Sequence, residues 1–271
     1  MKTPTTHPPH ERATRDGLPP PFDIEPSGHA TVVLAHPDDE LLVGGAIASL
    51  VGIGRSIDVL VLTDGERSTR GERRFVANGR RREESIAALE VYDIGVDHQH
   101  YLGLPDGGLA QAEVTATAVS GLAQVIKANR SRAVITTGTT GYDGHDDHKT
   151  AHGIAVAATR SLQDRYSASP AVWGLSERPG EETFYIDEEL LYLKLAALSR
   201  HRSQFTLHGA EPFKAPGYVT IGRYDIHPES AAHLFRYKEL LVQESYVRAV
   251  IPTPIAPEVG YTTSTERQLV S

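Results

Sequence analysis

Short apolar runs alternate along this chain with longer segments in which apolar residues recur at helical spacing. Runs rich in β-branched residues at 31–34, 57–63 and 133–137 predict buried strands. The intervening segments at 41–51 and 114–128 predict helices. Strands that alternate with helices form right-handed βαβ units. We therefore expect an α/β fold with a mostly parallel sheet.

Weaker patterns complete the expected elements and divide the chain. We expect a flexible N-terminal extension over residues 1–28, a single α/β domain over residues 29–250 and an irregular tail over residues 251–271. Within the domain we expect further strands at 100–102, 171–175, 183–186 and 218–221, and further helices at 81–92, 149–160, 188–201 and 231–246.

Composition excludes several classes of protein. The formal net charge of −8 over 271 residues argues against a nucleic-acid binder, which usually carries a basic stripe. The chain has no cysteine, so a zinc site would use His, Asp or Glu. It has no apolar run of the ~20 residues that a membrane span needs. The N-terminal residues lack the apolar core of a secretory signal, so we expect a cytoplasmic protein.

The first group of candidate functional residues follows the first strand. The segment at 35–40 reads Ala-His-Pro-Asp-Asp-Glu and leads directly into a predicted helix. In open α/β sheets, ligands bind beyond the carboxyl ends of the strands. His36 and Asp39 are three residues apart across a turn, so both side chains can converge on one metal ion.

A second group follows the strand at 133–137. The segment at 144–148 reads Gly-His-Asp-Asp-His, and His148 could be the third ligand. A catalytic zinc ion keeps three protein ligands and one position for water, whose pKa then falls toward ~7. His36, Asp39 and His148 would meet that need for Zn²⁺, and Fe²⁺ is an alternative because such a site accepts either ion.

The remaining polar residues of the two groups could handle protons. Asp38, beside a ligand, could act as general base on the zinc-bound water. His145 could stabilise the oxyanion or protonate the leaving amine, and Asp147 could fix the tautomer of His145 and raise its pKa. Glu40 fits the acidic preference of a helix start.

Each group also has a simpler explanation. An Asp-Asp pair before a helix is usually an N-cap, and a His-rich loop is usually polar surface. Support of a metal ligand from behind, or core packing, is a better interpretation of His152 than direct binding of the ion. Asp106 could be a turn residue, and no function is assigned to the following histidines: His98, His100 and His201.

Taken together, these motifs resemble one family, the PIG-L/LmbE-like zinc N-deacetylases. The similarity extends from about residue 32 to residue 204 and is strongest in its first motif. It rests on Ala-His-Pro-Asp-Asp-Glu at 35–40, Leu-Thr-Asp-Gly-Glu at 62–66, Arg-Arg-Glu-Glu at 81–84, Leu-Gly-Leu-Pro-Asp at 102–106, the run from Gly144 to His152, and His-Arg-Ser-Gln at 201–204.

The resemblance implies a Rossmann-like fold with helices on both faces of the sheet. It assigns the zinc ligands and Asp38, His145 and Asp147 to the same roles as above, and it adds substrate contacts from Arg81 and Asp106. Tyr142 lies near a carbonyl-polarising tyrosine of some members, with a spacing one residue longer. Asp146 stands where many members have proline.

The implied reaction is removal of acetyl from an N-acetylglucosamine-containing small molecule, with release of acetate. Two alternatives remain open. The first is an amidase that cleaves a longer acyl group from an amino-sugar or thiol conjugate, and the second is a carbohydrate-binding protein without activity. The aglycone, the acyl chain and the oligomeric state are not predicted.

Overall fold

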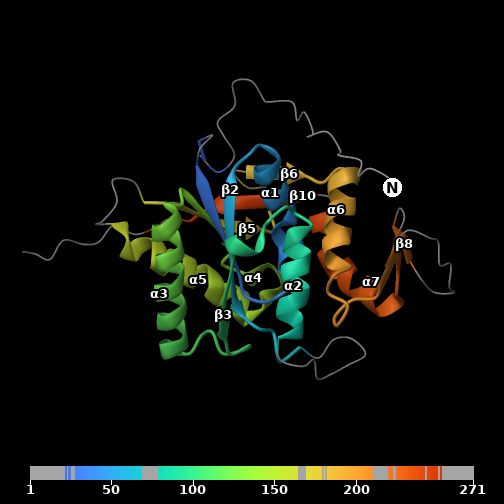
Figure 1. Ribbon diagram of the computed structural model, residues 1–271, viewed down its shortest axis with the longest axis horizontal. Coiled ribbons are helices and arrows are strands. Elements are labelled where there is room, and N and C mark those ends of the chain that lie inside the picture. The colour runs from blue at the N-terminus through green and yellow to red at the C-terminus, as the bar shows by residue number, and fades with distance from the viewer. Residues whose placement is uncertain are drawn as a thin grey trace, which may run out of the picture.

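In a computed structural model, the chain forms one mixed seven-stranded sheet, a small three-stranded sheet and the helices around them (Figure 1). The structure describes residues 22, 24–25, 28–68, 79–163, 169–178, 180, 182–209, 219–221, 224–241, 243–249 and 251. The large sheet contains β1 (His29–Leu34), β2 (Ser56–Thr63), β3 (Gln99–Leu104), β4 (Ala133–Thr137), β5 (Ala171–Ser176), β6 (Glu182–Tyr185) and β10 (Gln243–Arg248). The α-helices are α1 (Glu40–Gly52), α2 (Arg80–Glu90), α3 (Ala112–Asn129), α4 (Gly141–Gly144), α5 (Asp146–Ser161), α6 (Glu188–Leu198) and α7 (Pro228–Leu234). Two 3-10 helices are η2 (Val96–His98) and η4 (Phe235–Leu241).

The strand order creates a natural ligand-binding edge. The order is β3-β2-β1-β4-β5-β10-β6, and the first five strands are mutually parallel. The chain passes from β1 to β2 on one side, whereas β4 pairs with β1 on the other side. The crevice beyond the carboxyl ends of β1 and β4 is therefore a topological switch point, where open α/β sheets bind ligands.

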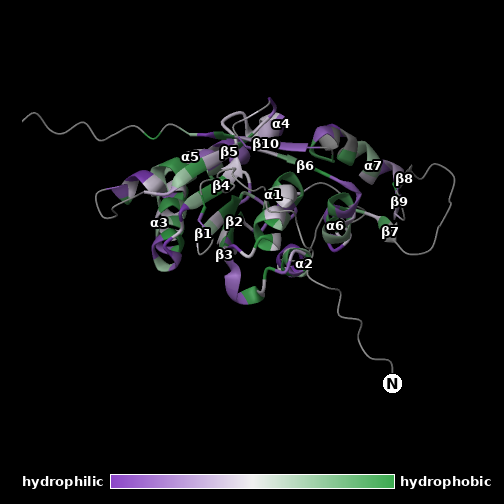
Figure 2. Cartoon of the chain, turned by 90° about the horizontal axis from the view of Figure 1, so that it is seen from above, coloured by the Kyte–Doolittle hydropathy of each residue, from purple (hydrophilic) through white to green (hydrophobic). Residues whose placement is uncertain are grey.

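Alternate residues of the parallel strands build two separate cores. On β1, Val32 and Leu34 pack with α1 and α2, whereas Val33 packs with α3 and α5. The same alternation on β2 sends Val59 to the first core and Leu60 to the second. Side chains alternate between the faces of a strand, so a sheet covered on both sides needs apolar residues at every position. Seen from above, helices lie on both sides of the sheet (Figure 2). The predicted mostly parallel α/β sheet is confirmed.

The structure corrects the predicted start of the ordered domain. Phe22 and Ile24 are fully buried, although residues 1–28 were expected to be a flexible extension. The Phe22 ring lies 5.4 Å from the Trp173 ring and 5.1 Å from that of Tyr246, both at edge-to-face angles. Burial of an aromatic side chain outweighs the turn-forming character of its proline-rich surroundings. Residues 1–21 and 252–271 lie outside the described residues.

The predicted helix at 231–246 is wrong over its second half. Helix α7 ends at Leu234, η4 follows, and β10 then runs antiparallel between β5 and β6. Glu244 and Tyr246 are fully buried in this strand. Hydrogen bonding to a partner strand on each side outweighs a helical pattern in the local sequence. The short strands β7 (Leu207–Gly209) and β9 (Tyr224–Ile226) were also not predicted, while β8 (Val219–Ile221) was.

A buried ion pair joins β10 to α6, and its carboxylate also bonds α1. Lys194 of α6 and Glu244 are both fully buried and in contact. Glu244 also accepts hydrogen bonds from the amides of Gly45 and Ala46 in α1, at 2.7 and 2.9 Å. The carboxylate therefore ties together the helix that starts at the first motif, α6 and the last strand.

Replacing Lys194 by methionine should destabilise the protein by about 3–5 kcal/mol, because Glu244 would remain buried without its cation. Adding Glu244→Gln should recover part of this loss, since glutamine is neutral but offers only one acceptor oxygen to the two α1 amides. Urea unfolding of the two variants measures both effects. A single variant as stable as wild type would contradict the expectation.

Among the described residues, no helix combines the length and the apolar character that crossing a bilayer requires.

Candidate functional site

The turn after β1 is strained and held in place by an arginine. Asp38 has a φ of 97°, a left-handed conformation that residues other than glycine rarely adopt. Arg81, at the start of α2, donates to Asp38 Oδ1 at 2.8 Å and to the carbonyls of Pro37 and Gly65 at 2.6 Å. Strained residues persist where their surroundings over-determine them, typically at functional sites. The Arg81 guanidinium thus fixes the turn and the direction of the Asp38 carboxylate.

Asp39 does not act as the helix cap that its position would suggest. It is the N-cap residue of α1, yet its side chain makes no hydrogen bond to the helix amides. Instead, Oδ1 lies 3.1 Å from His148 Nε2, and Oδ2 lies 3.4 Å from His36 Nδ1. Tetrahedral ligands about 2.1 Å from an ion lie roughly 3.4 Å from one another. The three predicted metal ligands therefore come together around one carboxylate.

The two imidazoles are each held at their other nitrogen. His148 Nδ1 lies 3.1 Å from the Gly141 carbonyl and 3.1 Å from Asp143 Oδ1. Metal-binding histidines usually donate their second ring N–H to a carbonyl or carboxylate, which fixes the ring and its tautomer. His148 sits in the first turn of α5, because this helix begins at Asp146, three residues before its predicted start.

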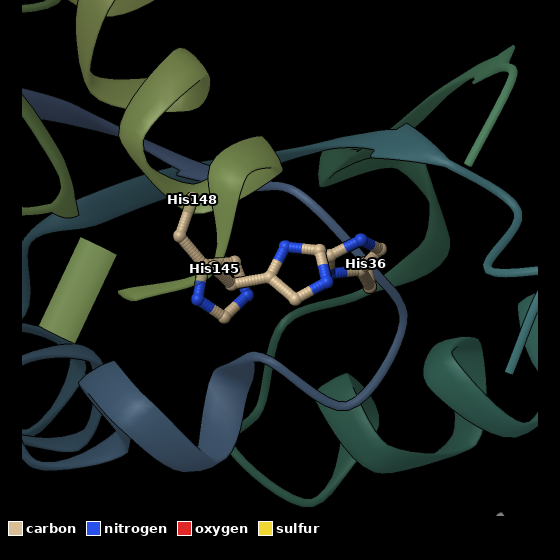
Figure 3. Close-up of side chains that lie close together, drawn as sticks. All are labelled: His36, His145 and His148. Carbon is tan, nitrogen blue, oxygen red and sulfur yellow. The ribbon is translucent and has the colours of Figure 1, made fainter. Parts of the chain in front are cut away.

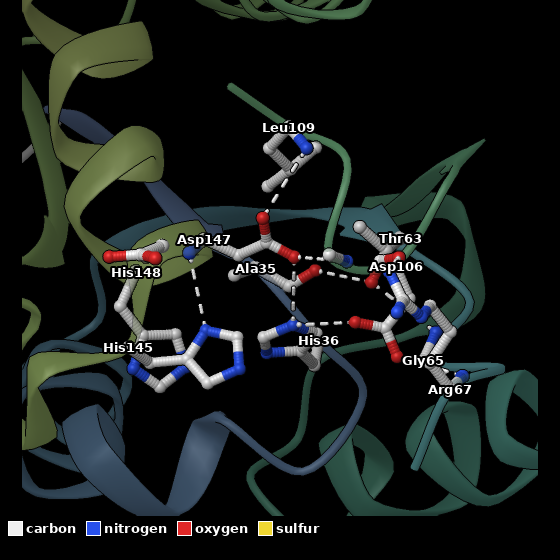
Figure 4. Close-up of polar contacts among 12 residues, drawn as sticks. Ala35, His36, Thr63, Gly65, Arg67, Asp106, Leu109, His145, Asp147 and His148 are labelled. Carbon is white, nitrogen blue, oxygen red and sulfur yellow. Dashed lines mark hydrogen bonds and ion pairs between the residues drawn. The ribbon is translucent and has the colours of Figure 1, made fainter. Parts of the chain in front are cut away.

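His36 has the same arrangement with two acidic residues. His36 Nε2 lies 3.2 Å from Asp106 Oδ1 and 3.3 Å from Asp147 Oδ2 (Figure 4). The Asp147 carboxylate also accepts from the amides of Gly107 and Leu109. Asp106 accepts from the Arg67 amide at 2.9 Å. Both carboxylates therefore support His36.

This arrangement corrects the contact expected of Asp147. The Asp147 carboxylate bonds His36 and not His145, which instead accepts at Nδ1 from the Asp147 amide at 3.2 Å. His145 is the N-cap of α5, so its ring is directed by the helix start. Because Nδ1 accepts, the tautomer that this bond favours carries its proton on Nε2. The expected rise of the His145 pKa is also wrong: burial and the neighbouring His36 and His148 lower it.

The three histidines form a compact group at the mouth of the crevice. The His145 ring centroid lies 4.8 Å from that of His36 and 4.9 Å from that of His148 (Figure 3). His36 also belongs to two sets of side chains that are close enough to hold a metal ion. One set is His36, His145 and His148, and the other is His36, Asp106 and Asp147.

The local electrostatics favour positive charge at the imidazoles of His36 and His148. Burial lowers the pKa of His148, but Asp39 and Asp143 outweigh this effect and raise it to about 10. His36 behaves likewise: burial opposes its charge, yet Asp39, Asp106 and Asp147 raise its pKa well above the usual value. Burial would raise the pKa of Asp39, but His148 and His36 lower it well below the usual value. A site with this field suits a cation.

These residues line a cavity of about 570 Å³. Its walls contain six aspartates against two arginines and the imidazoles of His36 and His148, whose raised pKa values keep them protonated without an ion, so its charge is moderately negative. The aspartates are Asp38, Asp39, Asp106, Asp143, Asp146 and Asp147, and the arginines are Arg67 and Arg81. Such a volume admits a sugar ring with part of a conjugate. The charge favours a neutral or cationic ligand over an anionic one.

Tyr142 lies elsewhere, against the expectation that it contacts the substrate. It lines a neighbouring cavity with Glu239 and Gln243 and is absent from the walls of the histidine cavity. Its backbone has a φ of 60°, a non-helical conformation inside α4. Burial, with nearby Glu239, raises its pKa to about 12.

Sequence reasoning missed several supporting residues. His201, to which no function was assigned, is fully buried and pairs with Glu40 at the start of α1. Glu66 accepts from the Asp106 amide at 2.8 Å. The available signal was the match of residues 62–66 and 201–204 to family motifs, which did not reveal these contacts. His152, in contrast, bonds the Thr137 carbonyl in the core, as its packing interpretation predicted.

Replacing Arg81 by lysine should lower both stability and activity. A lysine ammonium cannot serve the three acceptors in the planar geometry of the guanidinium, and unsatisfied buried acceptors cost about 1–3 kcal/mol. If Arg81 mainly holds the turn, kcat should fall more than KM rises. A change in KM alone, with an unaltered melting temperature, would favour the substrate contact predicted from the sequence.

The comparison with known families agrees with this geometry. Residues 31–159 match the profile of the PIG-L family, described as GlcNAc-PI de-N-acetylase. The matched segment contains the strained turn, Arg81, Asp106 and the start of α5. This part of the chain is therefore similar to the PIG-L family.

Individual curated proteins are similar to about half of the chain. The chain is 31% identical over 172 residues to the 1D-myo-inositol 2-acetamido-2-deoxy-alpha-D-glucopyranoside deacetylase of Mycobacterium sp. (strain KMS), a match that covers 55% of this chain and 54% of that protein. The chain thus spans about half the length of this curated relative.

Solved structures of similar fold agree with the α/β architecture described above. A conserved protein of Thermus thermophilus aligns with a TM-score of 0.57 at 24% identity, over 84% of this chain and 97% of that one. The N,N'-diacetylchitobiose deacetylase of Pyrococcus horikoshii aligns with a TM-score of 0.55 at 20% identity, over 66% of this chain and 72% of that one. These similarities support the α/β fold alone.

Proposed function

We propose that the protein is a metal-dependent N-deacetylase that removes acetyl from an N-acetylglucosamine-containing conjugate. The observation that carries the proposal is the arrangement of two imidazoles around Asp39. His36 turns Nδ1 and His148 turns Nε2 toward this carboxylate, while partner residues hold the opposite nitrogens. The relatives' acetamido-sugar substrates support the choice of substrate class.

The donor set fits a zinc ion held by His36, Asp39 and His148. Two neutral imidazoles and one carboxylate are common ligands of catalytic zinc, and iron(II) accepts the same set. When bound, such an ion supplies Lewis acidity, which polarises an amide carbonyl and lowers the pKa of water. Asp106 and Asp147 support His36, and mutation of such outer partners typically lowers metal affinity by about 10- to 100-fold.

Asp38 is the proposed general base. Its Oδ1 is held by Arg81, and Oδ2 has no hydrogen-bond partner among the described residues. Oδ2 can therefore take the proton of the attacking water as the new carbon–oxygen bond forms. The same oxygen can return that proton to the amine as the carbon–nitrogen bond breaks, which leaves acetate and the free amino sugar.

His145 is placed to stabilise the oxyanion. Its Nδ1 accepts from the Asp147 amide, so Nε2–H is the group available to a ligand in the cavity. A hydrogen bond from Nε2 to the acetyl oxygen would strengthen as negative charge develops there. Loss of one such donor typically costs about 100- to 1,000-fold in kcat.

The test is a screen for acetate release from N-acetylated amino-sugar conjugates. The purified chain would be stripped with a chelator and reloaded with zinc or iron(II), and acetate would be measured for each form. Activity that depends on added metal and on the acetamido group supports the proposal. Preferential cleavage of longer acyl amides would favour the amidase alternative, and an inactive but sugar-binding, metal-reloaded protein would favour a binding role.

A further inference from the structure

A second group of histidines lies at the opposite, amino-terminal edge of the sheet. It surrounds Asp58, whose side chain is only 3% exposed although it interrupts the apolar strand β2. Burying a carboxylate is costly unless nearby groups compensate its charge. The partners of Asp58 therefore require an explanation, and the proposed deacetylase mechanism does not use them.

Three imidazoles from separate segments surround this carboxylate. His29, the first residue of β1, contacts Oδ2, and His98 Nδ1 of η2 lies 3.5 Å from the same oxygen. His100 Nε2 of β3 lies 2.7 Å from Oδ1. Two imidazoles thus face one carboxylate oxygen, and the third holds the other oxygen. The pKa of Asp58 is about 2, because hydrogen bonds and charge from His29 and His100 outweigh the effect of burial, so it is an anion at neutral pH.

We propose that His29, Asp58 and His98 form a second site for a transition-metal dication of the zinc class, with His100 orienting the carboxylate. Two neutral imidazole nitrogens and one carboxylate oxygen make a donor set that suits Zn²⁺, Ni²⁺ and Cu²⁺, whereas Mg²⁺ and Ca²⁺ prefer oxygen ligands alone. Support of a ligand carboxylate by a further hydrogen bond is common in such sites.

The exposure of the three rings fits entry of an ion from solvent. The side chains of His29, His100 and His98 are 16%, 35% and 53% exposed, respectively. The His98 ring, the most exposed of the three, can therefore rotate to direct Nδ1 at an ion beside Oδ2 without disturbing the core. A bound ion would connect the start of β1, Asp58 of β2 and η2, which precedes β3. It would therefore stabilise these strands against separation.

The site is independent of the histidine cavity. His29 precedes His36 by a full strand, which at about 3.3 Å per residue separates the two edges by roughly 20 Å. Substitutions at His98 should therefore leave deacetylase activity unchanged. Conversely, loss of the ligands around Asp39 should leave the second site intact.

The experiment is to count zinc equivalents in the metal-stripped full-length chain by isothermal titration. We expect two equivalents for wild type, one for His98→Ala, one for Asp39→Asn and none for the double variant. His227→Ala, which removes a partly exposed histidine outside both groups, serves as the matched control and should bind two. Zinc saturation of Asp39→Asn at 100 times Kd should raise its melting temperature by about 5 °C or more, and His98→Ala should abolish that rise.

The half-exposed His98 can be replaced without risk to folding, whereas Asp58→Asn could destabilise β2. A Cu²⁺ titration of Asp39→Asn, followed by electron paramagnetic resonance, should show nitrogen ligands that disappear with His98→Ala. An Asp39→Asn protein that binds no zinc and shows no such copper signal overturns the second site. A wild type that binds a single equivalent of zinc, which is lost in Asp39→Asn, would support the proposed function and refute this inference.

Discussion

Replacing Asp38 by asparagine should lower kcat by about 100- to 10,000-fold while the fold and the metal content remain unchanged. Asparagine keeps an oxygen that can accept from Arg81, and it tolerates the left-handed conformation that φ 97° imposes better than most residues do. It cannot, however, accept a proton from water at neutral pH. The variant therefore separates proton transfer from the shape of the turn.

Steady-state acetate release and metal analysis of the purified variant provide the measurement. Asp146→Asn is the matched control, because Asp146 lines the same cavity but its side chain is 90% exposed and, among the described residues, bonds only Lys149. We expect near wild-type turnover for the control. If Asp38→Asn also turns over at the wild-type rate with its metal bound, another residue is the general base.

Replacing Asp39 by asparagine should remove the ion and with it nearly all activity, a fall of about 1,000-fold or more. The carboxylate lies between His36 and His148 and is the charged member of the proposed ligand set. A neutral amide there binds a dication far more weakly. Lewis-acid stabilisation is worth several kcal/mol, and each 1.36 kcal/mol is tenfold in rate.

A graded series makes this second prediction more specific. Metal affinity should fall most for Asp39→Asn, by about 10- to 100-fold for Asp147→Asn, and not at all for Asp146→Asn. The Asp147 carboxylate contacts His36 Nε2, the ring nitrogen opposite the one that faces Asp39, whereas the Asp146 side chain is exposed. Competition with a colorimetric chelator measures all three affinities. A larger loss for Asp147→Asn than for Asp39→Asn would point to the alternative set of His36, Asp106 and Asp147 as the ligands.

The parallel strands could be predicted from the sequence, because their local apolar pattern agrees with their burial in the folded sheet. The strands ending at Leu34, Thr63 and Thr137 are continuous apolar runs, as strands buried on both faces must be. The final strand could not be predicted in this way. Residues 243–248 include Glu244, which is stable in the core only because Lys194 and two α1 amides, distant in sequence, neutralise and bond it.

The site was predictable in its residues more than in its contacts. The positions of His36, Asp39 and His148 at strand ends led to the expectation that they converge, and their side chains do lie around one carboxylate. The partner of Asp147 was not predictable, since it depends on where residues 106–109 pass over α5. Likewise, no pattern in the sequence indicated that hydrogen bonds from Arg81 hold the turn after β1.

The place of β10 in the sheet has a consequence for how the chain folds. Among the described residues this strand is the last in sequence, but it lies between β5 and β6, so the sheet is open at an internal position until residues 243–248 have been synthesised. Before that point β6 has no partner strand, and α1 lacks the carboxylate that its Gly45 and Ala46 amides require. Contacts between such distant segments form slowly. A chain interrupted just before Gln243 would therefore expose two unpaired strand edges, which are typical starting points for aggregation.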